Sequence, residues 1–137
     1  MLIEIESYLN RTIASCQLSD GAVEFLQKII EDIGLEHHII QTDPERPILV
    51  ASWIGEEPSL PSILLNSHTD VVPVYPDKWK HDPFEAIKEE GRIYGRGTQD
   101  MKCVTIQYLK AIQRLKEKGV KIRRTIHLTF MPGYSKI

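Results

Sequence analysis

A short aliphatic run that ends in a histidine and an aspartate constrains the fold of this chain most strongly. Residues Ile63–Asp70 read Ile-Leu-Leu-Asn-Ser-His-Thr-Asp, with Pro61 and Pro73 close on either side. This length, with proline at both ends, predicts a strand, and its continuous aliphatic residues predict one that is buried on both faces. Ligands in open α/β sheets bind just beyond the carboxyl ends of such strands. We therefore expect His68 and Asp70 to lie at a functional site.

The His68-x-Asp70 pair suits metal binding chemically. An imidazole can bind zinc through one ring nitrogen while its other N–H donates to a carboxylate that fixes the tautomer and the ring orientation. A histidine at a strand end is, however, more often a solvated loop residue than a metal ligand. The metal-site hypothesis therefore depends on a second motif.

The second motif is the glycine-rich segment Gly95–Lys102, which leads into the strongest helix predicted for the chain. This order predicts that Asp100 lies at the amino terminus of the helix, where the helix dipole favours an ionised carboxylate. The carboxylate could there be a metal ligand or a plain helix cap, and the sequence leaves both open. A phosphate-binding loop is disfavoured, because the lysine–serine pair is missing and the G-x-G-x-x-G pattern is incomplete.

Hydrophobic periodicity and turn residues predict the remaining elements. We expect a short first helix from Leu2, Ile5 and Leu9, helices over residues 19–33 and 101–118, strands over residues 37–41, 48–54 and 124–131, and a hairpin around Glu90-Gly91. A right-handed crossover between parallel strands would bring Met131 to the same sheet edge as His68. His127 is expected to be a structural histidine rather than a ligand.

The apolar surface of this chain is expected to be incompletely covered. Ile106 and Leu109 fall outside the main apolar stripe of the second long helix, so we expect them to meet a second neighbour or to be exposed. The strand Ile126–Phe130 is expected to present further exposed apolar residues. Low solubility and aggregation through an open strand edge would follow.

Composition indicates a single domain and excludes several classes of partner. The chain has 137 residues, 17 basic and 19 acidic, with no basic block, so neither nucleic acid nor a membrane surface is an expected partner. The acidic start of the chain does not resemble a secretory signal, and no apolar run approaches the length of a membrane span. Cys16 and Cys103 are far apart and are expected to be free thiols. We therefore expect a cytoplasmic protein.

Three stretches carry a family resemblance: Leu64–Pro73, Trp79–Ala86 and Tyr94–Cys103. Together they resemble the aminoacylases, the N-acyl-L-amino-acid amidohydrolases of the dinuclear-zinc deacylase and exopeptidase family. The resemblance implies an α/β fold, namely part of a zinc-hydrolase domain with a mixed, mostly parallel sheet and flanking helices. It places residues 1–132 in the N-terminal part of the catalytic domain and leaves 133–137 as a tail without family counterpart. A lid or dimerisation domain, inserted later in the family, is expected to be absent here.

The resemblance also implies roles for the site residues. His68 would be a ligand of one zinc, Asp100 would bridge two zinc ions, and Asp70 would be the catalytic-site carboxylate that orients His68. The implied reaction is zinc-dependent hydrolysis of an N-acyl-L-amino acid to a carboxylate and a free amino acid. Water activated by the metal would attack the acyl carbonyl, while a glutamate would relay the proton to the leaving amine.

The chain departs from the family after Pro132. The family continues with an Asp-Glu-Glu run that supplies the general base and a second-zinc ligand, whereas this chain continues with Gly133. We therefore expect incomplete zinc ligation and an inactive chain when it is alone. The alternatives are a catalytically silent fragment or interaction module, and a sibling zinc exopeptidase or dipeptidase. The expected partner is a small N-acyl amino acid; the homodimer implied by the family would need the domain that is expected to be absent.

Overall fold

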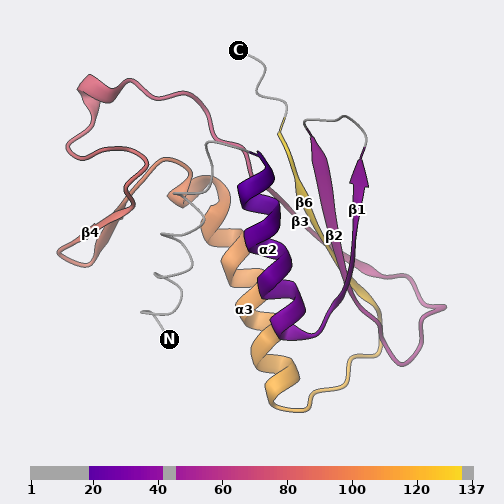
Figure 1. The fold of residues 1–137 in the computed structure, drawn as a ribbon. Coiled ribbons are helices and arrows are strands. Elements are labelled where there is room, and N and C mark those ends of the chain that lie inside the picture. The colour runs from indigo at the N-terminus through magenta and orange to yellow at the C-terminus, as the bar shows by residue number, and fades with distance from the viewer. Residues whose placement is uncertain (1–18, 42–45, 134–137) are drawn as a thin grey trace.

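The computed structural model describes residues 19–41 and 46–133 (Figure 1). The expected first helix from Leu2, Ile5 and Leu9, the thiol of Cys16 and most of the tail after Gly133 lie outside the described residues. Within the described part, no helix is long and apolar enough to cross a membrane.

A four-stranded sheet forms the centre of the fold. Its strands are β1 (Glu36–Gln41), β2 (Pro47–Trp53), β3 (Ile63–His68) and β6 (Ile126–Met131), in the order β1-β2-β6-β3. β3 pairs with β6 in parallel, and the two pairs that involve β2 are antiparallel. The predicted mixed sheet is confirmed, but the prediction of a mostly parallel sheet is wrong for the described strands, because β2 runs antiparallel to both of its neighbours, β1 and β6.

The parallel pair β3–β6 places the expected residues at one sheet edge. His68 and Met131 are directly opposite each other in the register. The long helix α3 (Cys103–Glu117) lies between these strands in the chain, so the connection is the crossover that the sequence predicts. The carboxyl ends of β3 and β6 therefore meet where His68 is.

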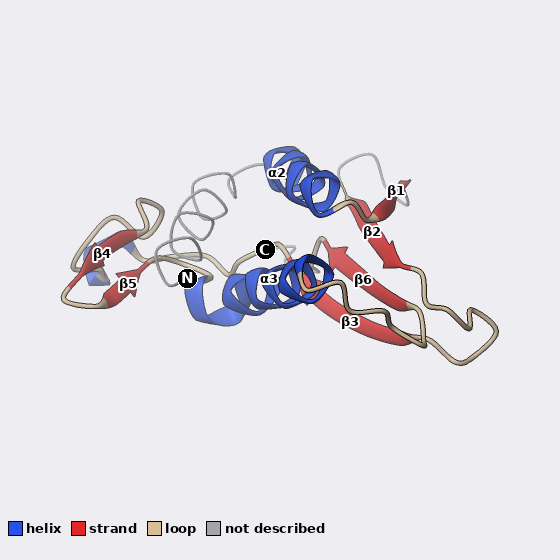
Figure 2. Cartoon of the chain, turned by 90° about the horizontal axis from the view of Figure 1, so that it is seen from below, coloured by secondary structure: helices blue, strands red, loops and turns tan. Residues whose placement is uncertain are grey.

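Helices α2 (Ser19–Ile33) and α3 cover the same face of the sheet (Figures 1 and 2). α2 contacts β1 and β2, α3 contacts β3, and the two helices contact each other. Gly34 follows α2 with a φ of +70°, in the left-handed conformation that commonly ends a helix. Each helix therefore buries an apolar stripe against one layer of strands.

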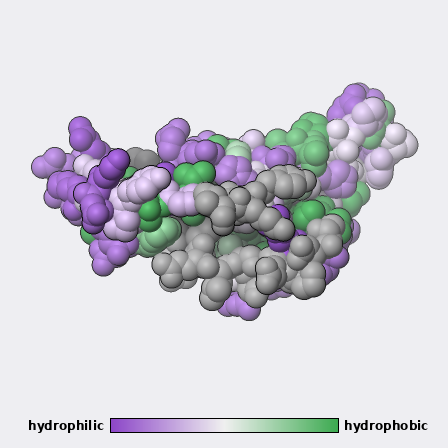
Figure 3. Space-filling view, turned by 90° about the horizontal axis from the view of Figure 1, so that it is seen from above, coloured by the Kyte–Doolittle hydropathy of each residue, from purple (hydrophilic) through white to green (hydrophobic). Residues whose placement is uncertain are grey.

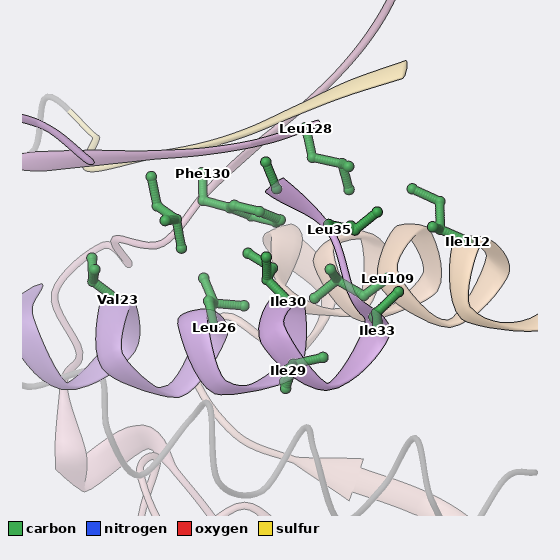
Figure 4. Packing of buried hydrophobic residues seen from close by; sticks show 12 residues of the cluster. Val23, Leu26, Ile29, Ile30, Ile33, Leu35, Leu109, Ile112, Leu128 and Phe130 are labelled. Atoms are coloured by element: carbon green, nitrogen blue, oxygen red, sulfur yellow. The ribbon is translucent and has the colours of Figure 1, made fainter. Parts of the chain in front are cut away.

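The main core lies between the sheet and the two helices (Figure 4). Leu128 and Phe130 of β6 are 0% and 1% exposed, so the expectation of exposed apolar residues on this strand is wrong. The core is completed by aliphatic residues of both helices and of β2, among them Leu26, Ile30, Leu49, Ala51, Leu109 and Ile112.

Helix α3 buries a second apolar face, so of the two alternatives expected for Ile106 and Leu109 the second neighbour is confirmed and exposure is wrong. Both side chains are 1% exposed. Leu109 faces the main core, whereas Ile106 packs with Ala86 in a separate cluster beside the loop that precedes the hairpin. The second neighbour that the sequence leaves open therefore exists, because the 69–86 loop folds back onto α3.

The sheet face opposite the helices carries polar pairs as well as apolar residues. His127 Nδ1 lies 2.8 Å from Ser52 Oγ, and the Thr129 hydroxyl donates to Asn66 Oδ1 at 2.7 Å. His127 is half-buried, which confirms the prediction of a structural histidine. Figure 3 shows hydrophobic patches between hydrophilic regions of the surface. The exposed large apolar residues are Ile39, Ile40, Ile54, Ile63, Leu64, Val72, Tyr75, Leu115 and Val120.

A small hairpin extends from the main body. Strands β4 (Ile87–Glu89) and β5 (Arg92–Tyr94) pair antiparallel, after a loop that contains the short helix η1 (Pro76–Lys78). Glu90 and Gly91 form the turn with φ values of 50° and 76°. Positive φ at both central residues is typical of the tight turns that join two antiparallel strands, which confirms the predicted hairpin.

Candidate metal centre

The end of β3 is tied firmly to both of its neighbours. Ser67 is fully buried, and the Thr105 hydroxyl of α3 donates to its Oγ at 2.9 Å. The backbone N–H of Thr69 donates to the carbonyl of Met131 at 2.9 Å, which extends the pairing with β6 by one residue. These hydrogen bonds therefore hold the backbone in place where the turn from His68 to Asp70 begins.

One side of the His68 ring faces Asp70. Nδ1 lies 3.0 Å from the carboxylate Oδ1 of Asp70 and 3.1 Å from its backbone oxygen. Both oxygens are acceptors, so Nδ1 carries the proton and donates it toward Asp70. This contact is the arrangement expected from the His-x-Asp spacing, and it directs the other ring nitrogen away from Asp70.

The other side of the ring faces Asp100. His68 Nε2 lies 3.1 Å from Asp100 Oδ1. The Asp100 side chain is 84% exposed and the His68 side chain 33% exposed, so the pair opens to solvent. The structure thus brings His68, Asp70 and Asp100 together, with the histidine between the two carboxylates.

The local structure around Asp100 differs from the predicted helix start. Asp100 lies in a single wide turn, η2 (Thr98–Lys102), with a φ of −124° and a ψ of 96°, and its peptide bond to Met101 is cis. The helix α3 begins only at Cys103, and no side chain caps it. The prediction that Asp100 lies at the helix terminus is therefore wrong, because the kinked turn directs its carboxylate to His68.

Two cavities share His68 and Asp70 as lining residues, and the larger also contains Asp100. The larger, of about 390 Å³, is lined by His68 and Asp70, by the loop residues after them, and by the segment from Ile93 to Asp100. The smaller, of about 300 Å³, is lined by His68 and Asp70 together with the end of β6. His68 and Asp70 therefore lie between the two cavities.

The wall of the larger cavity contains an arginine that sequence patterns did not single out. The Arg96 guanidinium lies 5.1 Å from the ring centre of Trp79, within cation–π distance. Its backbone N–H donates to Pro83 at 2.7 Å. Its Nε is buried without a hydrogen-bond partner among the described residues. Its position between Gly95 and Gly97 was the only feature of the sequence that could have indicated a role for Arg96 at the site.

A cluster of charged groups supports the hairpin end of this wall. Glu89 accepts from both Lys80 and His81, and the His81 ring meets the edge of Tyr94 at a centroid distance of 4.9 Å. The hydrogen bond from Lys80, and secondly that from His81, lowers the pKa of Glu89 below its usual value; the same bond raises the pKa of Lys80. The side chain of His81 is 18% exposed, so this histidine is largely covered by its neighbours.

The donor set at His68 and Asp100 fits part of a zinc site. Two ligand atoms about 2.0–2.1 Å from a shared tetrahedral zinc lie ~3.3 Å apart, close to the separation of Nε2 and Oδ1. Imidazole and carboxylate are both ordinary zinc ligands. The described residues contain no group of three or more histidine, cysteine or acidic side chains placed to hold a metal, and a catalytic zinc needs about three protein ligands.

Curated relatives share much of the sequence of this chain. It is 57% identical to aminoacylase-1 of Mus musculus and 54% identical to that of Homo sapiens, over 113 residues in each case. These alignments cover 82% of this chain and 28% of each relative. Aminoacylase-1 of Dictyostelium discoideum is 43% identical over 114 residues. The chain therefore spans a little over a quarter of the length of these relatives.

Solved structures share the fold. The M20 family metallo-carboxypeptidase Sso-CP2 from Sulfolobus solfataricus matches with a TM-score of 0.77 at 27% identity, over 91% of this chain and 30% of that one. The di-peptidase Dug1p from Saccharomyces cerevisiae matches with a TM-score of 0.77 at 20% identity, over 94% of this chain and 32% of that one. The sequence of residues 64–133 matches the peptidase family M20/M25/M40. That match contains His68, Asp70 and Asp100, and the chain belongs to this family.

Proposed function

We propose that this chain supplies part of the metal centre of a zinc-dependent hydrolase of N-acyl-L-amino acids. The observation that carries the proposal is the contact of His68 Nε2 with Asp100 Oδ1 at the edge of a cavity. It is supported by the 54–57% identity to aminoacylase-1 of mouse and human over 113 residues. Cytoplasmic location, the division into residues 1–132 and 133–137, and any homodimer are further predictions.

Each of the three residues has a separate role in the proposal. His68 would hold zinc through Nε2 and Asp100 through its carboxylate, as the ligand shared by two metal ions. Asp70 faces His68 Nδ1, so that Nε2 would be the ring nitrogen that binds the metal. Bound zinc would polarise the acyl carbonyl and make water a better nucleophile at neutral pH.

The cavity beside these residues has the size of a small-molecule site. Its volume of about 390 Å³ is within the usual range of ~300–1,000 Å³ for ligand pockets. Trp79 and Tyr94 supply aromatic lining, and the pair His68–Asp100 supplies polar groups at one side. An amino acid with a short acyl group is of a size to fit this space.

The 137-residue chain is proposed to be inactive by itself. The described residues offer two zinc donors, and no glutamate lines either cavity. Removal of a positioned general base lowers rates by about 10²–10⁴-fold, and incomplete ligation adds to that loss. The relatives are about three times as long, and the further ligands and the base are proposed to correspond to their additional length.

Two alternatives differ from this proposal in class or in substrate. One is a silent or interaction module without catalytic role. The other is a zinc dipeptidase, a substrate class that the names of some solved relatives state. The high identity to aminoacylase-1 favours the deacylase over both.

A chimera tests the proposal. The aligned 113-residue segment of mouse aminoacylase-1 would be replaced by that of this chain, and hydrolysis of N-acetyl amino acids and of dipeptides would be measured. We expect deacylation, which His68→Ala and Asp100→Ala each reduce by at least ~10²-fold. Asp77→Asn, an exposed carboxylate outside the cavity lining, is the matched control and should keep the rate. A folded, zinc-loaded chimera that cleaves dipeptides alone, or nothing, would contradict the proposal.

A further inference from the structure

Lys102 is buried to an extent that is unusual for a lysine. Its side chain is 1% exposed and is the largest of the fully buried side chains in the described part of the chain. Lysine is almost never fully buried unless its ammonium group is paired, because removing the charge from water is costly. The hydrogen-bond partners of this ammonium group therefore indicate why Lys102 is buried.

The ammonium group binds the turn that carries His68 and Asp70. Lys102 Nζ donates to the carbonyl oxygen of Thr69 at 2.9 Å. Thr69 is the residue between His68 and Asp70, and its N–H and hydroxyl both donate to the Met131 carbonyl, at 2.9 and 3.3 Å. The Thr69 residue is thus held from β6 on one side and from Lys102 on the other.

The backbone of Lys102 belongs to the turn that carries Asp100. Its N–H donates to the Gly97 carbonyl at 3.0 Å and closes the wide turn η2. Gly97 has a φ of +82°, and a Cβ on it would overlap Val71 and lie 2.9 Å from Lys102 Cε. The absence of a side chain at Gly97 therefore leaves the path along which Lys102 reaches Thr69.

We propose that Lys102 is a positioning residue for the candidate metal centre. It ties the His68–Asp70 turn to the Asp100 turn and so sets the separation of the imidazole and the carboxylate. This inference rests on the proposed function only where it calls His68 and Asp100 metal ligands. A purely structural lysine would stabilise the fold without affecting the orientation of His68 relative to Asp100.

The first test uses the wild-type chain without metal, in dilute solution. In nuclear magnetic resonance spectra, the ammonium group of Lys102 should exchange slowly with water and show a scalar coupling to the Thr69 carbonyl carbon through the hydrogen bond. The ring-nitrogen shifts of His68 in the same sample give the reference pattern for the second test. An ammonium group that exchanges as fast as that of exposed Lys118 would overturn the proposal.

The second test compares Lys102→Met with Lys118→Met, a control at the exposed end of α3. Methionine retains a long apolar stem but donates no hydrogen bond. We expect Lys102→Met to alter the His68 ring pattern and to weaken Zn²⁺ binding by roughly 10–100-fold, the usual effect of losing a group that orients a ligand. Lys118→Met should change neither. Unchanged His68 signals in a folded Lys102→Met chain would overturn the proposal.

The two proposals fail in different ways. If wild-type chain does not bind Zn²⁺ but Lys102→Met still alters the His68 signals, the proposed function fails and the positioning role stands. If Zn²⁺ binds equally to wild type and Lys102→Met, the positioning role fails and the proposed function stands. If Lys102→Met does not fold, the wild-type exchange and coupling measurements decide.

Discussion

His68 Nε2 and Asp100 Oδ1 lie 3.1 Å apart although 32 positions separate the two residues in the chain. The contact joins the end of β3 to the turn before α3, and the ring of His68 is held from behind by Asp70. Strand β3 and the turn η2, which are connected in the chain by a long loop and a hairpin, therefore contact each other through these two side chains. The first two predictions concern this contact.

Loss of either donor should remove most of the zinc affinity of the chain. His68→Ala and Asp100→Asn each leave only one of the two proposed zinc ligands. A single side-chain ligand does not hold zinc in competition with water and buffer. We expect weak Zn²⁺ binding to wild type and at least ~10-fold weaker binding to each variant, measured by calorimetric titration. Asp77→Asn, which removes an exposed carboxylate far along the loop, should bind as wild type does. Equal affinity of all four chains would contradict the assigned ligands.

Loss of the carboxylate behind His68 should weaken metal binding without removing a ligand. In Asp70→Asn, the amide oxygen can still accept from Nδ1, but the negative charge that makes the ring a better donor is gone. Substitutions of this kind typically lower metal affinity by about 10–100-fold. The same titration, with thermal unfolding beside it, checks this. Unchanged affinity would show that the contact of Asp70 with His68 has no effect on binding.

The elements of the fold follow largely from local patterns. The aliphatic run between two prolines gives β3, and the glycines at 34 and 119 end the two helices as expected. These features depend on neighbours in the sequence, so periodicity and turn residues suffice to predict them. The position of Met131 beside His68 also follows, since a crossover between parallel strands brings their carboxyl ends to one sheet edge. The prediction that β3 is buried on both faces is wrong, because β3 is an edge strand of the described sheet and its first two residues are exposed.

The errors concern features that depend on tertiary structure. Ile106 is off the main stripe of α3, and only the return of the 69–86 loop onto the helix explains its burial beside Ala86. The wide turn at Asp100 has no periodic signature, so the sequence predicted that the helix begins at Asp100. Burial of Lys102 was not predicted, because lysine patterns rarely indicate a buried position.

The 137-residue chain should not hydrolyse N-acetyl amino acids above a buffer control, even with Zn²⁺ present. The described residues place no glutamate at either cavity, and two donors hold the metal incompletely. Loss of a general base alone lowers a rate by about 10²–10⁴-fold. Release of free amino acid, followed chromatographically, measures this. Turnover that disappears in His68→Ala would contradict the prediction.

The ion cluster at the hairpin should stabilise the chain only while Glu89 is ionised. The folded state lowers the pKa of Glu89, chiefly through its hydrogen bond with Lys80, so its contribution is present above the usual carboxylate pKa of ~4.3 and is lost as the pH falls through the lower folded value. Glu89→Gln should therefore lower the unfolding temperature slightly at neutral pH and not at all in acid, because exposed pairs contribute little. Glu90→Gln in the adjacent turn is the control. An effect of Glu89→Gln that grows in acid would contradict this sign.

Association of the chain should proceed through the open edge at β3. This strand lies at the end of the described sheet, and its residues Ile63 and Leu64 are 46% and 62% exposed. An exposed apolar edge strand offers unpaired backbone groups to another copy, and natural proteins block such edges with lysine. We therefore expect concentration-dependent aggregation of wild type in light scattering, and a marked reduction in Leu64→Lys. Val120→Lys adds the same charge at an exposed apolar residue outside the strands and should reduce aggregation less. A wild-type chain that stays a monodisperse monomer at high concentration would contradict the role of this edge.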